Sequence, residues 1–117
     1  GNERPFSLNE VAPNPLSEAL NRLWAQHLGQ LKERVAILTA GAHTLAAETI
    51  DPVPLAEACS AAHKLAGVLG TFGLHEGTEL AREAERLCGA AVHDRAALSL
   101  RLVEIVDRLS TLIAQKR

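Results

Sequence analysis

Aromatic side chains are scarce in this sequence, where phenylalanine, tryptophan and tyrosine together account for 3% of the residues. Proteins that bind single-stranded nucleic acid stack the bases on aromatic side chains, so this composition argues against such a surface. The formal net charge is −2 at pH 7, which leaves no overall basic character. The composition therefore indicates that neither nucleic acid nor an anionic membrane is a partner.

The sequence also has few cysteines and no long apolar stretch. Two cysteines, Cys59 and Cys88, are too few to form a disulfide framework. No basic segment followed by an apolar stretch indicates a signal peptide. No apolar run approaches the roughly 20 residues needed to span a bilayer. We therefore expect reduced thiols and a cytoplasmic location.

What the chain does have is helical periodicity. Leucine, alanine and other apolar residues recur three and four positions apart through most of the sequence. No segment alternates strictly enough between apolar and polar residues to indicate a strand. A chain of 117 residues can bury one hydrophobic core. These features predict a single all-α domain.

Capping residues and prolines predict where the helices begin and end. Residues 1–14 are polar and interrupted by prolines, so we expect a disordered or extended lead-in there. A first helix begins at Pro15, and we expect Gly29 to kink it or to separate it from the next helix. The second helix should end near Ile50, because Pro52 disfavours helical backbone before it. Three more helices follow.

Short connections between these helices favour antiparallel neighbours. We therefore predict that residues 15–117 form an antiparallel up-down four-helix bundle with an additional N-terminal helix.

A histidine on the third predicted helix is the first candidate functional residue. Cys59, His63, Gly67 and Gly70 share one face of this helix, offset from its apolar stripe. His63 should therefore lie at the edge of the core or outside it. Glycine at position 67 costs about 1 kcal/mol of helix stability relative to alanine, so we expect it to serve packing or the approach of a partner.

The turn after this helix predicts a partner for the histidine. If the third and fourth helices form a hairpin that pivots near Leu74, His63 and Glu85 lie side by side because they are equally far from the pivot. A carboxylate that accepts from Nδ1–H would fix the tautomer and leave the lone pair of Nε2 free. It would also stabilise the positive charge that develops when Nε2 attacks an electrophile.

The segment from Ala62 to Gly67, with Gly73 and Glu85 downstream, resembles the histidine-containing phosphotransfer (HPt) domain of bacterial multistep phosphorelays. The resemblance covers roughly residues 31–117. It implies that Nε2 of His63 accepts a phosphoryl group and that Glu85 orients the ring. It also implies that Gly67 leaves room for a receiver domain. The family usually carries a lysine three residues after the histidine, where this chain has Ala66, and we expect Lys64 to supply part of that charge.

The resemblance also implies the partners. They are the receiver domain of a response regulator, a sensor histidine kinase, or both. We expect docking on a small patch around His63 formed by Gly67, Gly70, Cys59, Ala40, His43 and Ala47. The protein would be a phosphoryl carrier rather than an autonomous enzyme, with no cofactor of its own and with Mg²⁺ held by the receiver.

Two other functions compete with phosphotransfer. Cys59 and His63 are four residues apart on one helix, and Cys88 and Glu85 could complete a tetrahedral zinc site. Alternatively, the bundle could be a helical adaptor that binds a partner helix and performs no chemistry.

Overall fold

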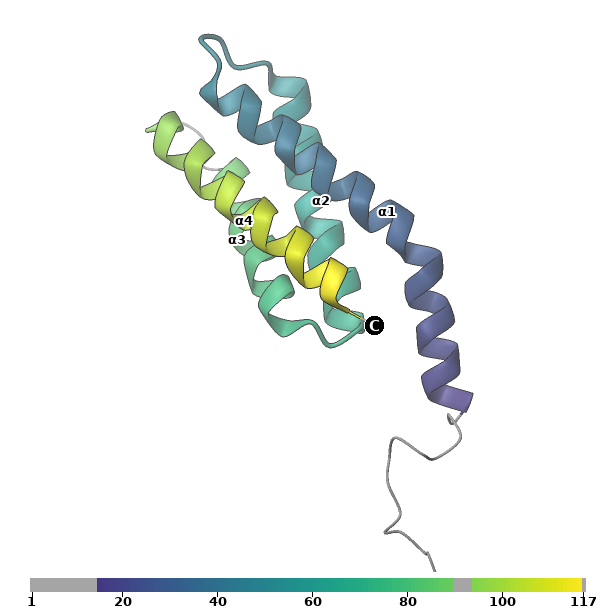
Figure 1. Cartoon of the computed structure of the whole chain (residues 1–117). Helices are drawn as coiled ribbons and strands as arrows, with labels where there is room; N and C mark the ends of the chain where they lie inside the picture. The colour runs from purple at the N-terminus through teal and green to yellow at the C-terminus, as the bar shows by residue number, and fades with distance from the viewer. Residues whose placement is uncertain (1–14, 90–93, 117) are drawn as a thin grey trace, which may run out of the picture.

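The structure is a computed structural model that describes residues 15–89 and 94–116. Over these residues, all regular secondary structure is helical, and four helices follow one another: α1 (Pro15–Ala46), α2 (Pro52–Thr71), α3 (His75–Gly89) and α4 (Arg95–Gln115). Both α1 and α3 pack against α2 and α4, and Figure 1 shows the chain reversing direction between successive helices. The all-α prediction is confirmed, whereas the predicted lead-in over residues 1–14 lies outside the described residues.

The predicted separation at Gly29 is wrong. Helix α1 runs without interruption from Pro15 to Ala46, so the expected additional N-terminal helix and the first bundle helix are one element. A glycine inside a helix costs about 1 kcal/mol relative to alanine but keeps its backbone hydrogen bonds, unlike a proline. Trp24, five residues before Gly29, and Leu31, two residues after it, are both buried. Packing on both sides of the glycine therefore holds the helix continuous.

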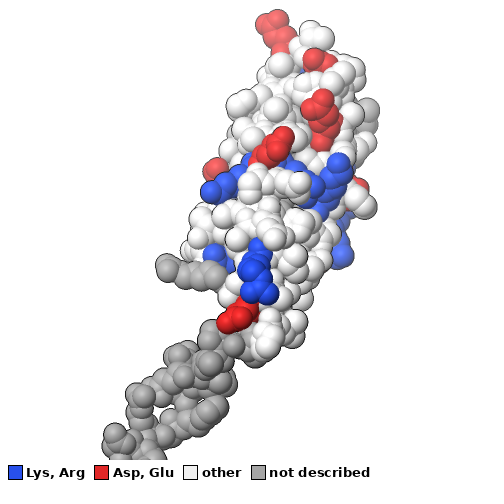
Figure 2. All heavy atoms as spheres, turned by 90° about the vertical axis from the view of Figure 1, so that its right-hand side faces the viewer, with Lys and Arg blue, Asp and Glu red and all other residues white. Residues whose placement is uncertain are grey.

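The first turns of α1 extend past the end of the other helices (Figure 1). Leu16, Leu20 and Leu23 are consequently exposed, although their spacing predicts a buried stripe. Burial begins at Trp24, whose ring meets Phe72 edge-on at a centroid distance of 5.1 Å. Figure 2, which faces this side of the molecule, shows both acidic and basic side chains with uncharged surface between them.

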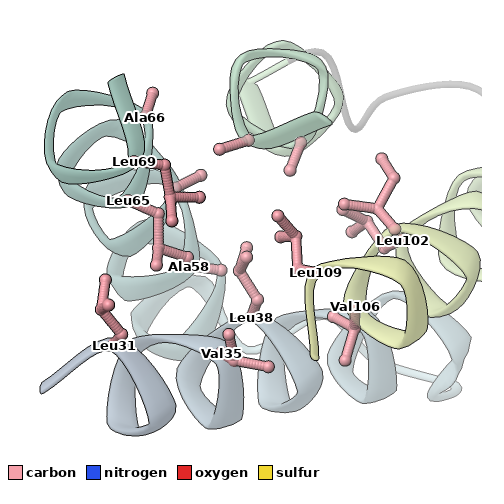
Figure 3. Packing of buried hydrophobic residues seen from close by; sticks show 14 of the residues in the cluster. Leu31, Val35, Leu38, Ala58, Leu65, Ala66, Leu69, Leu102, Val106 and Leu109 are labelled. Atoms are coloured by element: carbon pink, nitrogen blue, oxygen red, sulfur yellow. The ribbon is translucent and has the colours of Figure 1, made fainter. Parts of the chain in front are cut away.

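Three of the four helices supply the large residues of the core. The fully buried large side chains are Leu31, Leu38, Leu45, Leu65, Leu69, Leu102, Ile105 and Leu109, which come from α1, α2 and α4. Figure 3 shows leucines from these helices converging. Helix α3 contributes only small buried side chains, including Ala81 and Ala84. Small residues let α3 approach its neighbours closely.

The connection between α2 and α3 is a tight capped turn. Gly73 adopts a left-handed conformation with φ of 75°. Its N–H donates to the carbonyl of Gly70 at 3.1 Å, and the N–H of Leu74 donates to the carbonyl of Leu69 at 2.9 Å. This pair of bonds is the Schellman motif, which satisfies the last carbonyls of a helix. The turn therefore fixes how far α2 extends before α3 returns beside it.

Helices α1 and α2 cross closely at Gly41. A Cβ atom added to Gly41 would lie 2.5 Å from Cβ of Ala58 on α2, whereas one added to Gly29 would meet nothing within 4 Å. Only the first of these two glycines is therefore required by packing.

We expect the alanine variants of these two glycines to change stability in opposite directions. Gly41→Ala should lower the free energy of unfolding by about 1–3 kcal/mol, because the new methyl group forces the helices apart. Gly29→Ala should raise it by about 0.5–1 kcal/mol, because alanine favours the helix and has room. Urea denaturation followed by circular dichroism measures both. Equal stability of Gly41→Ala and the unsubstituted protein would contradict the close crossing.

Candidate functional site

The imidazole of His63 stands on the outer surface of α2. Its neighbours Ala62, Leu65 and Ala66 are buried in the core, and this leaves His63 on the opposite side of the helix. Its side chain is 75% exposed. A large partner can therefore reach the ring.

One ring nitrogen of His63 is held by a carboxylate of the next helix. Nδ1 lies 3.0 Å from Oε2 of Glu85 on α3. An ionised carboxylate only accepts hydrogen bonds, so Nδ1 must carry the proton in this contact. In the neutral ring, Nε2 then has its lone pair free and directed away from Glu85. The structure therefore brings together the two side chains that the hairpin argument paired.

Two arginines of α4 hold α3 in place. Arg101 donates to both carboxylate oxygens of Glu83 at 2.7 and 2.8 Å. Arg108 does the same to Glu76 at 2.6 and 2.9 Å. These hydrogen bonds lower the pKa of both glutamates from the usual 4.5. The paired carboxylates face α4, which leaves the side of α3 that carries Glu85 turned toward α2.

His63 and Glu85 border an open hollow of about 360 Å³ between α2 and α3. Ala66 and Gly67 of α2 line it as well, and so do Arg82 and Arg86 of α3. A Cβ atom added to Gly67 would meet nothing within 4 Å. The packing of this domain therefore does not require glycine at position 67, although the bare surface beside His63 depends on it.

A comparison of the sequence with known protein families shows which family the chain belongs to. A sequence model described as the Hpt domain matches residues 16–116. The chain belongs to the Hpt domain family. Hpt domains are phosphocarrier modules that act in phosphorelays through a histidine, so the predicted resemblance is confirmed. No curated protein and no solved structure matches the chain.

Other predicted site residues of this Hpt domain lie apart from the hollow at His63. Lys64 is exposed and lines a different hollow with Glu33 and Glu57, between α1 and α2. Ala47 lies in the connection after α1, where its carbonyl accepts a hydrogen bond from Arg95 at 3.3 Å.

The remaining predicted docking residues differ in exposure and in what they contact. Ala40 and His43 are exposed on α1, and Cys59 is half-buried on α2. Gly70 is exposed near the capped turn, and a Cβ atom there would lie 3.5 Å from Oγ1 of Thr78. Among the predicted docking residues, only Gly67 lines the hollow at His63 in the part of the chain that the structure describes.

Sequence reasoning missed Arg82 and Arg86. Their four-residue spacing places them on one side of α3, and both lie within one turn of Glu85. This spacing would have identified them if the face of α3 around Glu85 had been considered together with the face of α2 around His63.

The alternative metal site does not form. Within residues 15–89 and 94–116, no group of three or more histidine, cysteine, aspartate or glutamate side chains could hold a metal ion. Burial, reinforced by the neighbouring thiol of Cys59, raises the pKa of Cys88 to about 12. The thiolate is the form that binds metal, so Cys88 is a poor ligand.

None of the described helices combines the length and the apolar character that crossing a membrane requires.

We expect the ion pair between Glu83 and Arg101 to stabilise the fold at neutral pH and to lose this effect at acidic pH. The pKa of Glu83 is lower in the folded protein than in the unfolded chain. The stabilisation by this ion pair is therefore complete above the unfolded pKa of 4.5 and is lost as the pH falls through the folded pKa. Glu83→Gln should therefore unfold more easily than the unsubstituted protein at neutral pH. The difference should shrink as the pH falls below 4.5, as thermal denaturation across pH would show.

Asp107→Asn removes a carboxylate from an exposed position on the neighbouring helix α4 and serves as the matched control. A gap between Glu83→Gln and the unsubstituted protein that stayed constant with pH would show that the ion pair contributes nothing specific.

Proposed function

We propose that this Hpt domain is a phosphorelay carrier whose phospho-accepting residue is His63. It accepts the phosphoryl group from an aspartate of a receiver domain and passes it to an aspartate of another. The observation that supports this role is the pairing of an exposed Nε2 with an Nδ1 that Glu85 holds at 3.0 Å. The partners would be a response regulator receiver, a sensor histidine kinase, or both, and the location would be cytoplasmic.

This geometry supports the following transfer step. The Nε2 lone pair of neutral His63 attacks phosphorus in line with the bond to the aspartyl oxygen. The N–P bond forms as the P–O bond breaks, and the electron pair of that bond leaves with the aspartate carboxylate. The ring keeps its proton on Nδ1 and becomes positively charged. The carboxylate of Glu85 stabilises that charge, and transfer to the next aspartate reverses these steps.

The Hpt domain would act as a carrier rather than as an autonomous enzyme. It supplies an oriented nucleophile on a rigid pair of helices, and positioning of this kind lowers the barrier without further protein chemistry. The receiver would bring its own Mg²⁺, so the carrier needs no cofactor. The predicted contribution of Lys64 would act from the neighbouring hollow, beside Glu33 and Glu57.

We expect His63→Gln to abolish phosphorylation. The unsubstituted protein, incubated with a labelled phospho-receiver, should acquire label that is acid-labile and stable in alkali. His63→Gln should acquire none, because glutamine offers no nucleophilic nitrogen. His75→Gln changes an exposed histidine at the start of α3 and should accept label normally.

Two results would contradict the carrier role. One is equal labelling of His63→Gln and the unsubstituted protein. The other is a folded, unsubstituted protein that accepts label from none of a panel of receivers, which would favour the helical adaptor.

We expect Gly67→Gln to keep the fold intact but to impair docking of the receiver. The added side chain has open space in the free domain and favours the helix, so the free energy of unfolding should rise by about 0.5–1 kcal/mol. It should also obstruct a receiver at His63 and slow transfer by about tenfold or more, as overpacking of a close contact does.

Gly29→Gln is the matched control, because it fills open space on α1 and should leave transfer unchanged. Stopped-flow or quenched-flow transfer assays measure the rate. Unimpaired transfer to Gly67→Gln would show that the receiver does not dock over position 67.

A further inference from the structure

Two arginines of α3 face the hollow in which a phosphoryl group on His63 would lie. Arg82 and Arg86 line this hollow together with His63 and Glu85. Both arginines are exposed, so their guanidinium groups can move to meet a new anion.

The existing contacts of these arginines are weak. Arg82 contacts Glu79 at 3.2 Å on the same helix, with both side chains largely exposed, and such surface pairs contribute little. Arg86 makes no hydrogen bond or ion pair with any residue in the described ranges. Its electrostatic influence reaches Glu83, which Arg101 already holds. Neither arginine is therefore committed to the fold.

Helix α2 offers no comparable cation inside the hollow. The residue of α2 that lines it one turn after His63 is Gly67, and Ala66 lines it beside Gly67. Lys64 lines the hollow on the α1 side, with Glu33 and Glu57 as its acidic neighbours. A dianionic phosphoryl group on Nε2 that lies in this hollow would therefore find the cations that line it on α3.

We propose that Arg82 and Arg86 bind the phosphoryl group carried by His63, an inference that rests on the proposed function. A phosphoryl group on Nε2 presents three oxygens, and guanidinium groups donate paired hydrogen bonds to such oxygens. Arg82 exchanges the carboxylate of Glu79 for a phosphoryl oxygen, and Arg86 gains a partner. The two arginines thus favour the phosphorylated carrier over the free one.

A chemical donor tests this binding without a receiver. Phosphoramidate transfers a phosphoryl group to histidine, and the resonance of phosphorylated His63 in ³¹P NMR is the one missing from His63→Gln. Two neighbouring guanidinium groups stabilise the dianion, so Arg82→Gln/Arg86→Gln should raise the pKa of the phosphoryl group by about 0.3–0.7 units, the size expected of exposed ion pairs. A purely structural role would not move this value.

Matched variants isolate the position of the charge. Arg22→Gln/Lys32→Gln removes two exposed cations from α1 and should leave the phosphoryl titration unchanged, because salt screens charges more than about 8 Å apart. Lys64→Gln should change it less than the paired arginine variant does. An unchanged titration in Arg82→Gln/Arg86→Gln, or a larger change in Lys64→Gln, would overturn the proposal.

A receiver assay separates this inference from the proposed function. At equilibrium with a labelled receiver, the ratio of label on the receiver to label on the carrier should be about two- to fivefold higher for Arg82→Gln/Arg86→Gln than for the unsubstituted protein. This ratio corresponds to the same free energy as the expected pKa shift. If the receiver transfers nothing although phosphoramidate labels His63, the relay role fails while the titration still decides the arginine role. If label transfers but its distribution does not move, the arginine role alone fails.

Discussion

The hydrogen bond between Nδ1 of His63 and Glu85 depends on how closely and in what register α2 and α3 lie together. The closeness comes from small buried residues on α3, such as Ala81 and Ala84, which allow the helix to approach. The register comes from the capped turn at Gly73, which determines where α3 begins. A wider helix or a longer turn would move the carboxylate away from the ring, and the ring would lose its fixed tautomer.

The bundle separates stability from function in space. The large apolar residues come from α1, α2 and α4, and the bidentate ion pairs join α3 to α4. None of these contacts uses the surface between His63 and Gly67. That surface can therefore stay bare and open without weakening the core, even though a glycine at position 67 costs the helix about 1 kcal/mol. Such a cost is tolerable because the stabilising contacts lie on the opposite sides of the two helices.

Sequence reasoning could anticipate features that follow from local backbone geometry. Equal distances from the turn at Leu74 paired His63 with Glu85, because helical rise and a short connection determine which residues are level. The continuity of α1 through Gly29 could not be anticipated in this way, because it depends on Trp24 and Leu31 being buried by other helices. The same limit applied to Lys64, whose side chain faces a hollow that only the packing of α1 against α2 creates.

If the cations that bind the phosphoryl group lie on α3 rather than on α2, a single helix would supply both the carboxylate that orients the ring of His63 and the positive charge beside the phosphoryl group. In the free carrier, Arg82 contacts Glu79, and among the described residues neither arginine forms an ion pair with Glu85, so the carboxylate that orients the ring stays with His63. After the proposed transfer, the ring would carry a positive charge next to Glu85, and the phosphoryl group would carry negative charge next to the arginines. Each new charge would then lie beside a side chain of opposite sign on α3, so one helix could serve both the attack by Nε2 and the retention of its product.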